Sequence, residues 1–125
     1  MMRMESDLLE LLLAAAEKRL NKHEPLEWSE DTAMLVVLAT QGYPGSYPKG
    51  TVISAVEKAN AQPDTVVFHA GTELNSAGQL VSSGGRVLGV TSRASSVKEA
   101  AARSYAALDL IDWPQGISRI RCYSA

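Results

Sequence analysis

A chain of 125 residues with 46% hydrophobic and 21% charged side chains has the composition of one globular domain that can bury a core. Twelve basic against fourteen acidic side chains give a net charge of −2, which excludes the basic footprint of a nucleic-acid-binding protein. The single Cys122 excludes an intrachain disulfide, and the longest apolar run, residues 11–16, is too short to cross a membrane. No signal-peptide pattern begins the chain, so we expect a cytoplasmic protein.

Residues 5–20 have the spacing of an amphipathic helix. Apolar side chains recur every three or four residues on one side, at Leu8, Leu9, Leu12, Leu13, Ala16 and Leu20. Ser6 is placed to cap the first turn, and Asp7 suits the positive end of the helix dipole. Leu11 and Ala15 widen the apolar face, so we expect this helix to pack against two neighbours.

An apolar run and a turn-rich loop follow. Residues 33–39 are apolar without alternation, which predicts a central strand covered on both faces. Pro44 and Gly45 then fit the middle of a type II turn, and a second tight turn comes directly after it. Such a loop is stiff and can form one wall of a pocket. Residues 51–54 predict a short strand, and residues 55–63 are polar with room for one helical turn.

Three strand-like runs fill residues 66–91. The runs cover residues 66–74, 79–83 and 86–91, and clusters of Asn, Ser and Gly separate them at 75–78 and 84–85. Because both connections are short, we expect three antiparallel strands.

The last predicted element is a helix that begins with a capping box. Ser96 is the cap and Glu99 lies three residues on, so the helix should run to about Leu110. Its expected buried stripe is Val97, Ala101, Ser104, Tyr105 and Leu108. The order of elements favours an α+β fold, with a small antiparallel β-sheet packed by an N-terminal and a C-terminal helix.

His69 and Arg86 are the side chains of the strand region that can carry chemistry. His69 can act as a general base or hold a substrate, or it can be a structural imidazole bonded to a backbone carbonyl. Arg86 can grip a phosphate or carboxylate through two parallel hydrogen bonds, or it can pair with Glu73 or Asp64 across the sheet. The chain has no phosphate-loop, nucleophile-elbow or metal-ligand spacing, so we predict no catalytic residue and no metal site of its own.

Ordered motifs give the chain a resemblance to a known family. Residues 35–50, 68–72 and 83–91 resemble successive motifs of the C-terminal domain of glycinamide ribonucleotide synthetase, also called phosphoribosylamine–glycine ligase. That family is an ATP-grasp enzyme of purine synthesis, and residues 4–8 resemble the segment that leads from its ATP-grasp part into the C-terminal domain. The resemblance implies a domain of this type over residues 1–119. The tail over residues 120–125 diverges from the family.

The resemblance implies a reaction in which ATP phosphorylates the carboxylate of glycine and the amine of phosphoribosylamine attacks the acyl phosphate. The C-terminal domain of the family closes one side of the cleft for glycine and the amine sugar phosphate. By this analogy the loop of Gly42, Tyr43, Pro44 and Gly45 would form a wall. His69, Gly71 and Thr72 would line the amine or glycine side, and Arg86 and Arg119 would contact anions. His69 and Arg86 should then face the same side of the molecule.

The resemblance also implies that cofactor binding and catalysis depend on a different part of the enzyme. ATP and magnesium would bind to ATP-grasp lobes upstream of Met1, so we expect no cofactor on this chain and no activity by the chain alone. The partner would be a separate ATP-grasp domain. Two alternatives stay open: a stand-alone, non-enzymatic binding or assembly module of the same fold, and an unrelated small-ligand domain. Exposed apolar surface would also favour self-association, as a two-fold homodimer, and we expect neither nucleic acid nor a membrane as partner.

Overall fold

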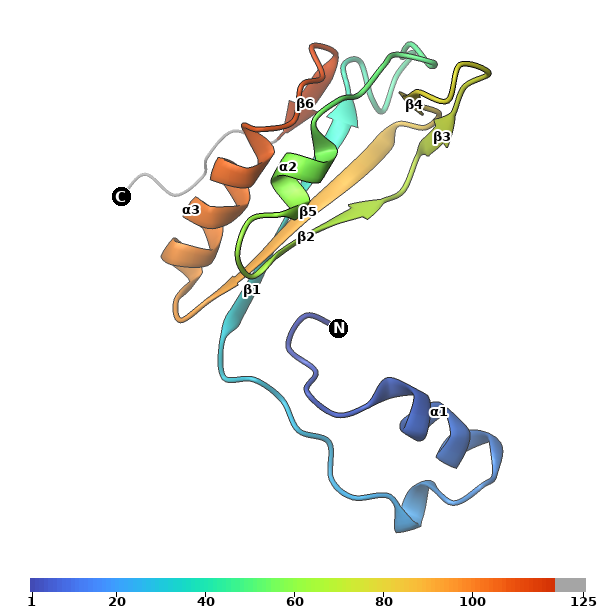
Figure 1. Cartoon of the computed structure of the whole chain (residues 1–125), viewed down its shortest axis with the longest axis vertical. Helices are drawn as coiled ribbons and strands as arrows, with labels where there is room; N and C mark the ends of the chain where they lie inside the picture. The colour runs from blue at the N-terminus through green and yellow to red at the C-terminus, as the bar shows by residue number, and fades with distance from the viewer. Residues whose placement is uncertain (119–125) are drawn as a thin grey trace.

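The structure, a computed structural model, describes residues 1–118, and its main body is an antiparallel sheet with two helices on one face (Figure 1). The four strands of this sheet lie in the order β2-β5-β1-β6, and β3 pairs with β4 in a second, two-stranded sheet. The strands are β1 (Thr32–Thr40), β2 (Thr65–His69), β3 (Thr72–Leu74), β4 (Leu80–Ser82), β5 (Arg86–Ala94) and β6 (Gly116–Ser118). The helices are α1 (Leu8–Ala16), α2 (Val56–Asn60) and α3 (Val97–Leu108), with a 3-10 turn η1 (Leu20–Lys22). The expected α+β class with an antiparallel sheet is confirmed.

Strand pairing differs from the three consecutive strands that the sequence predicted. The run 66–74 is split between β2, which pairs with β5, and β3, which pairs with β4. The chain bends at Gly71, where an added Cβ would lie 2.7 Å from both the carbonyl oxygen of Arg86 and the Cα of Gly84. Only glycine allows the three backbone segments to approach this closely. The bend therefore separates the two sheets.

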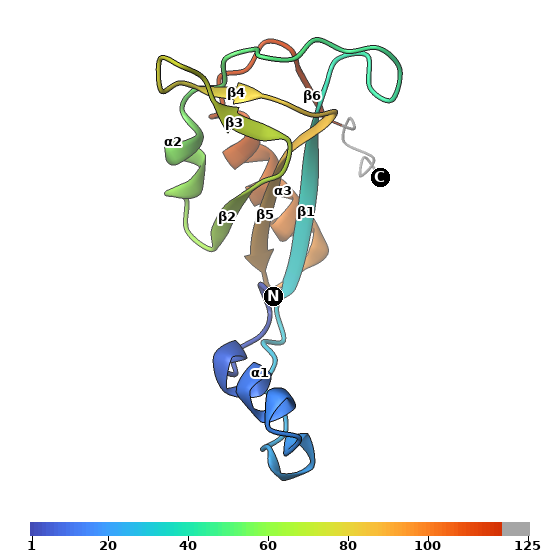
Figure 2. The same ribbon diagram turned by 90° about the vertical axis from the view of Figure 1, so that its right-hand side faces the viewer.

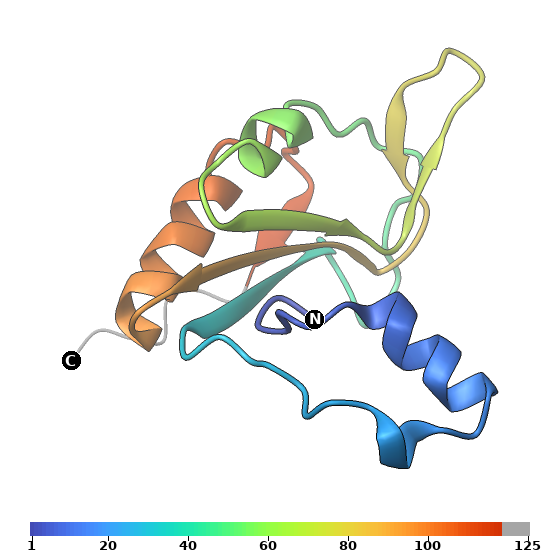
Figure 3. The ribbon, with the colours of Figure 1, turned by 60° about the horizontal axis from the view of Figure 1, so that its bottom comes forward.

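The core lies between the four-stranded sheet and helices α2 and α3. Figure 3 shows both helices on one side of this sheet, with the N-terminus on the other. Buried side chains of the core are Leu38, Ile53, Val56, Ala59, Val67, Val87, Leu88, Val90, Ala107 and Trp113. The Ser96 cap was predicted correctly, because its hydroxyl accepts a hydrogen bond from the Glu99 backbone N–H at 3.3 Å. The reciprocal bond of a capping box is not formed within residues 1–118, since the Glu99 carboxylate accepts from the Ser95 hydroxyl at 3.0 Å and from Arg103 at 2.8 Å. The buried stripe of α3 is Ala100, Ala101, Ser104 and Ala107, whereas Val97 is exposed.

The opposite face of the sheet is open. Leu35 and Val37 of β1 and Phe68 of β2 point to this face by strand alternation, and all three are exposed. Among residues 1–118, no helix packs over these side chains. The expectation that residues 33–39 are covered on both faces is therefore wrong, since only Val36 and Leu38 face the helices and are buried.

Helix α1 lies beyond the lower end of the sheet, at the tip of a stalk (Figure 2). The stalk consists of residues 3–6 and 27–29, which run side by side: the Glu5 N–H donates to the carbonyl of Glu27, and the Ser29 N–H donates to the carbonyl of Arg3. We call residues 3–29, with α1 and η1, the arm. Within residues 1–118, none of the helices has the length and apolarity that a bilayer crossing needs.

Two expectations about the N-terminal helix are wrong. The helix begins after Asp7, whose carboxylate accepts from the Leu9 N–H, while the Ser6 hydroxyl accepts from the Glu27 N–H in the stalk. The helix also does not pack against two neighbours, because Ala14 is its only buried residue. The helix that accompanies α3 on the sheet is α2, which occupies part of the polar stretch 55–63.

Candidate functional site

A pocket of about 780 Å³ lies on the open face of the four-stranded sheet. Leu35, Val37 and Phe68 line it, and so does Gly89 of β5, where an added Cβ would lie 2.8 Å from Cδ1 of Leu35. Gly89 therefore lets the Leu35 side chain lie across β5. Among the described residues, the lining is largely apolar and Arg86 contributes its one cationic side chain. A concave apolar surface with few polar groups is a common form of small-molecule site.

Arg86 begins β5 opposite Ala39 and reaches the open face at one end of the pocket. Its guanidinium has no ion-pair or hydrogen-bond partner among residues 1–118. The alternative in which it pairs with Asp64 is wrong, because Asp64 contacts Arg93 at 3.6 Å and Arg103 at 3.1 Å. Nor does any ion pair join Arg86 to Glu73 within the described chain. Its five donors are thus available to a carboxylate or phosphate.

The turn-rich loop after β1 contributes one aromatic ring to the pocket. An added Cβ at Gly85 would lie 2.1 Å from Cδ2 of Tyr43, so the Tyr43 ring rests directly on the Gly85 backbone. The positive φ of this loop falls at Gly42, at +97°, and not at Gly45, where the predicted type II turn required it. The peptide bond between Tyr43 and Pro44 is cis. Of the four loop residues named from the sequence, Tyr43 is the one that lines the pocket.

His69 lies on the other side of the sheet from Arg86. Phe68 and Ala70 line the pocket, so alternation along β2 turns the side chain between them to the opposite face. His69 stands opposite Leu88, whose side chain belongs to the core, and its Nδ1 lies 3.0 Å from Oγ1 of Thr72. The structure does not bring His69 and Arg86 to a common side, and the imidazole instead joins β2 to β3.

The other residues expected at the site are distributed between these two places. Gly71 and Thr72 lie at the bend between β2 and β3, with His69, and Arg119 lies outside the described residues. Leu35, Phe68 and Gly89 line the pocket but were not predicted as site residues, although a glycine inside a strand signals close approach of another group. Within residues 1–118, no three His, Cys, Asp or Glu side chains are grouped as a metal site requires.

Comparison with known proteins identifies the family. Residues 33–120 match the family described as "Phosphoribosylglycinamide synthetase, C domain". The chain is 51% identical over 120 residues to "Phosphoribosylamine--glycine ligase, chloroplastic" of Arabidopsis thaliana, a match over 95% of this chain and 22% of the relative. It is 50% identical over 117 residues to "Phosphoribosylamine--glycine ligase" of Vigna unguiculata, a match over 93% of this chain and 37% of the relative.

A solved structure shows the same fold. The crystal structure of phosphoribosylamine--glycine ligase from Thermotoga maritima superposes with a TM-score of 0.67 at 28% identity, over 88% of this chain and 27% of that one. The chain thus spans between 22% and 37% of the length of these ligases. With its family match over residues 33–120, the chain belongs to the phosphoribosylglycinamide synthetase C-domain family.

Proposed function

We propose that this chain serves as the C domain of a phosphoribosylamine–glycine ligase of purine synthesis, and that the open face of its sheet closes one side of the substrate cleft. The observation that supports this most directly is Arg86, which has no partner among residues 1–118 and lies at the end of an apolar pocket. The substrates of such a ligase carry a carboxylate and a sugar phosphate, and a planar guanidinium binds either group through two parallel hydrogen bonds.

Tyr43 and Arg86 take the substrate-facing roles in this proposal. Tyr43 forms the wall beside the anion contact, because its ring lies on Gly85, the residue before Arg86. His69, Gly71 and Thr72 support the cleft indirectly, by holding the bend that sets the start of β5. Arg119 stays a candidate anion contact from the sequence alone.

ATP, magnesium and the reacting atoms belong in this proposal to ATP-grasp lobes on the remainder of a ligase. The chain supplies a substrate-binding wall and no reacting group, so we expect no turnover by the chain alone. A cytoplasmic location stays a prediction, and the Arabidopsis relative is named as chloroplastic.

A chimeric enzyme tests the proposal. This chain replaces the 120 matching residues of the Arabidopsis ligase, and formation of product from ATP, glycine and phosphoribosylamine is measured beside the parent enzyme. We expect an active chimera. Arg86→Ala should raise the KM for one anionic substrate by about tenfold or more, since a hydrogen bond to a charged group contributes about 1.5–3 kcal/mol.

Lys98→Ala is the matched control, because Lys98 is an exposed cation at the start of α3, on the helix-covered side. A folded chimera without activity would refute the proposal, and turnover by the 125-residue chain alone would refute its dependence on the remaining lobes. The second candidate is a non-enzymatic binding or assembly module. The placement of His69 on the face opposite Arg86 favours it, and an inactive chimera would support it.

A further inference from the structure

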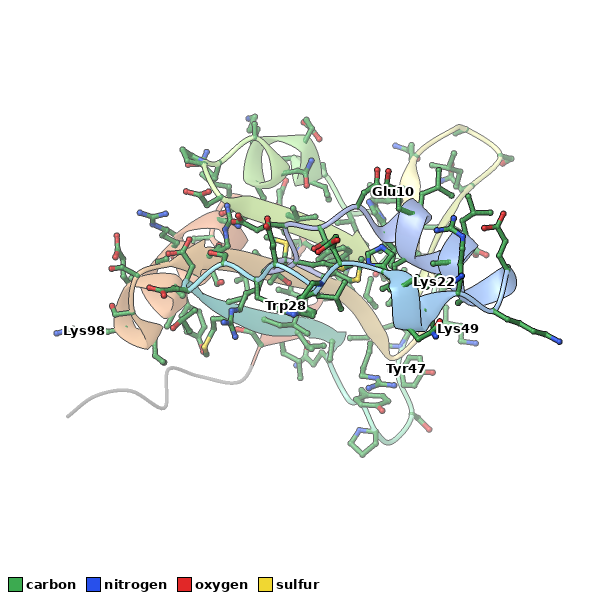
Figure 4. All side chains as sticks on the ribbon, turned by 90° about the horizontal axis from the view of Figure 1, so that it is seen from below. Glu10, Lys22, Trp28, Tyr47, Lys49 and Lys98 are labelled. Carbon is green, nitrogen blue, oxygen red and sulfur yellow. The ribbon has the colours of Figure 1, made fainter. Side chains whose placement is uncertain are left out.

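Helix α1 carries an apolar face that nothing in the described chain covers. Leu8, Leu9, Leu12 and Leu13 lie on one side of the helix by their spacing, and all four are exposed, Leu9 by 72% and Leu12 by 57%. Glu10 and Glu17 fall outside this leucine face. Figure 4, seen from the arm's end of the molecule, shows Glu10 on α1 and Trp28 on the stalk. Trp28 is exposed as well.

A helix of this length needs a packing partner. Alpha-helices shorter than about 12–15 residues are marginal in water, and most helical stability in proteins comes from burial of an apolar face. Helix α1 has nine residues and packs mainly against η1 within the arm. The leucine face is therefore the surface through which α1 would be stabilised by a second molecule or a further domain.

The stalk holds this face in a defined direction. Arg93 of β5 lies 3.8 Å from a Glu5 carboxylate oxygen and 3.5 Å from one of Asp31, and it donates to the carbonyl of Met2 at 3.3 Å. Arg3 adds two hydrogen bonds across the stalk to the carbonyl of Ser29, at 3.0 and 2.8 Å. An arm anchored at its root, with an uncovered apolar tip, is preorganised for docking, which reduces the entropy lost on binding.

The comparisons indicate what the tip would contact. The C-domain family match begins at residue 33, so α1 lies outside the C domain proper. The Arabidopsis ligase nevertheless matches over 120 residues, which cannot fit within residues 33–125, so the match extends through most of the arm. The arm therefore corresponds to ligase sequence that comes before the C domain. Its natural surroundings are the part of the ligase that the match does not cover.

We propose that the arm docks this chain onto the remainder of a phosphoribosylamine–glycine ligase, with the leucine face of α1 buried in that part's apolar core. The identity of the partner rests on the proposed function, whereas the role of the arm in docking goes beyond that function. The open face of the sheet stays available for the substrate cleft. The competing occupant is a second copy of this chain, in the homodimer that the sequence led us to expect.

Co-expression tests the docking. The Arabidopsis ligase without its 120 matching residues is expressed together with the full 125-residue chain, which carries a purification tag. We expect the two to co-purify. Leu9→Lys with Leu13→Lys should weaken the complex by about 100-fold or more, because two leucine side chains would lose their apolar burial. The matched control is Leu74→Lys, a 69% exposed leucine on β3, which should leave binding unchanged.

Three outcomes would overturn the proposal. The first is that the truncated ligase does not co-purify with the unsubstituted chain. A truncated ligase that stays insoluble during co-expression counts as this outcome, because docking should cover the surface that the deletion exposes. Another is equal binding by the α1 double variant. The third is a stable homodimer of this chain that does not bind the ligase and that the α1 substitutions dissociate. The leucine face would then contact a second copy of this chain.

Hydrogen exchange on the chain alone gives a further, independent measurement. The α1 amides should exchange far faster than those of α3 in the free monomer and become protected on ligase binding. Equal protection of both helices in the monomer would contradict the proposal. If the chain binds the truncated ligase but the chimeric enzyme is inactive, the proposed function is refuted and the docking is not. If the chimeric enzyme is active but the separate chain does not bind the truncated ligase, the docking is refuted and the proposed function is not.

Discussion

Replacement of Ser104 by alanine should destabilise the fold far more than the loss of one oxygen atom suggests. Ser104 lies on α3 and is fully buried. Its hydroxyl accepts a hydrogen bond from the Ser92 backbone N–H at 3.0 Å and donates one to the carbonyl of Met34 at 2.9 Å. The helix thus completes the hydrogen bonding of β5 and β1, which lie side by side.

The expected magnitude follows from the two backbone groups that lose this partner. Leaving a buried donor or acceptor unsatisfied costs about 1–3 kcal/mol. The Ser92 N–H is the more serious loss, because Ser92 is fully buried, whereas Met34 is only partly buried. We expect Ser104→Ala to lower the free energy of unfolding by about 2–3 kcal/mol, or Tm by roughly 8–12 °C for a chain of this size.

Urea unfolding followed by circular dichroism measures this loss as a shift in midpoint at constant slope. Ser76→Ala is the matched control, since Ser76 is exposed in the turn between β3 and β4 and should shift the free energy by about 0.5 kcal/mol or less. If Ser104→Ala behaves like Ser76→Ala, the bridging hydroxyl does not stabilise the sheet and the reasoning is wrong.

Three further substitutions test other parts of the structure. Gly85→Ala should displace the Tyr43 ring, since the new Cβ would lie 2.1 Å from Cδ2, and unchanged ring-proton NMR shifts would count against this packing. Arg93→Gln should speed amide exchange in the stalk while lowering global stability by only about 1 kcal/mol or less; equal exchange rates would show that Arg93 does not hold the arm. Trp113→Phe should lower unfolding stability by about 1 kcal/mol, because Nε1 donates to Thr51 Oγ1 at 2.9 Å; an unaltered denaturation midpoint would contradict this.

Local signals in the sequence predicted the parts of the fold that depend on local chemistry. The start of α3 was predicted correctly because the Ser96 hydroxyl accepts from the Glu99 N–H three residues on, within one turn. The pairing of β2 with β5 was missed, since the run 66–74 shows no break except Gly71. The need for glycine there arises from contacts with Gly84 and Arg86, which are distant in sequence and come together only in the folded chain.

The candidate site was predicted in part, for a similar reason. Arg86 was expected at an anion site and does line a pocket, but His69 was expected beside it and lies on the other face. The face of a strand residue changes with a shift of one position in register. Here β5 has an irregularity at Val87, where Leu38 pairs with Leu88 but Ala39 pairs with Arg86. No local sequence pattern predicts the extra residue of this β-bulge.

The contacts of Arg93 make the arm responsive to ionic strength. Its guanidinium is partly exposed and lies 3.8 Å from a carboxylate oxygen of Glu5, which belongs to the arm, so dissolved ions can screen this attraction. Dilute buffer should hold the arm closer to a single orientation, and concentrated salt should widen the range that it samples. A partner that contacts both the arm and the sheet would then bind more tightly as the salt concentration falls.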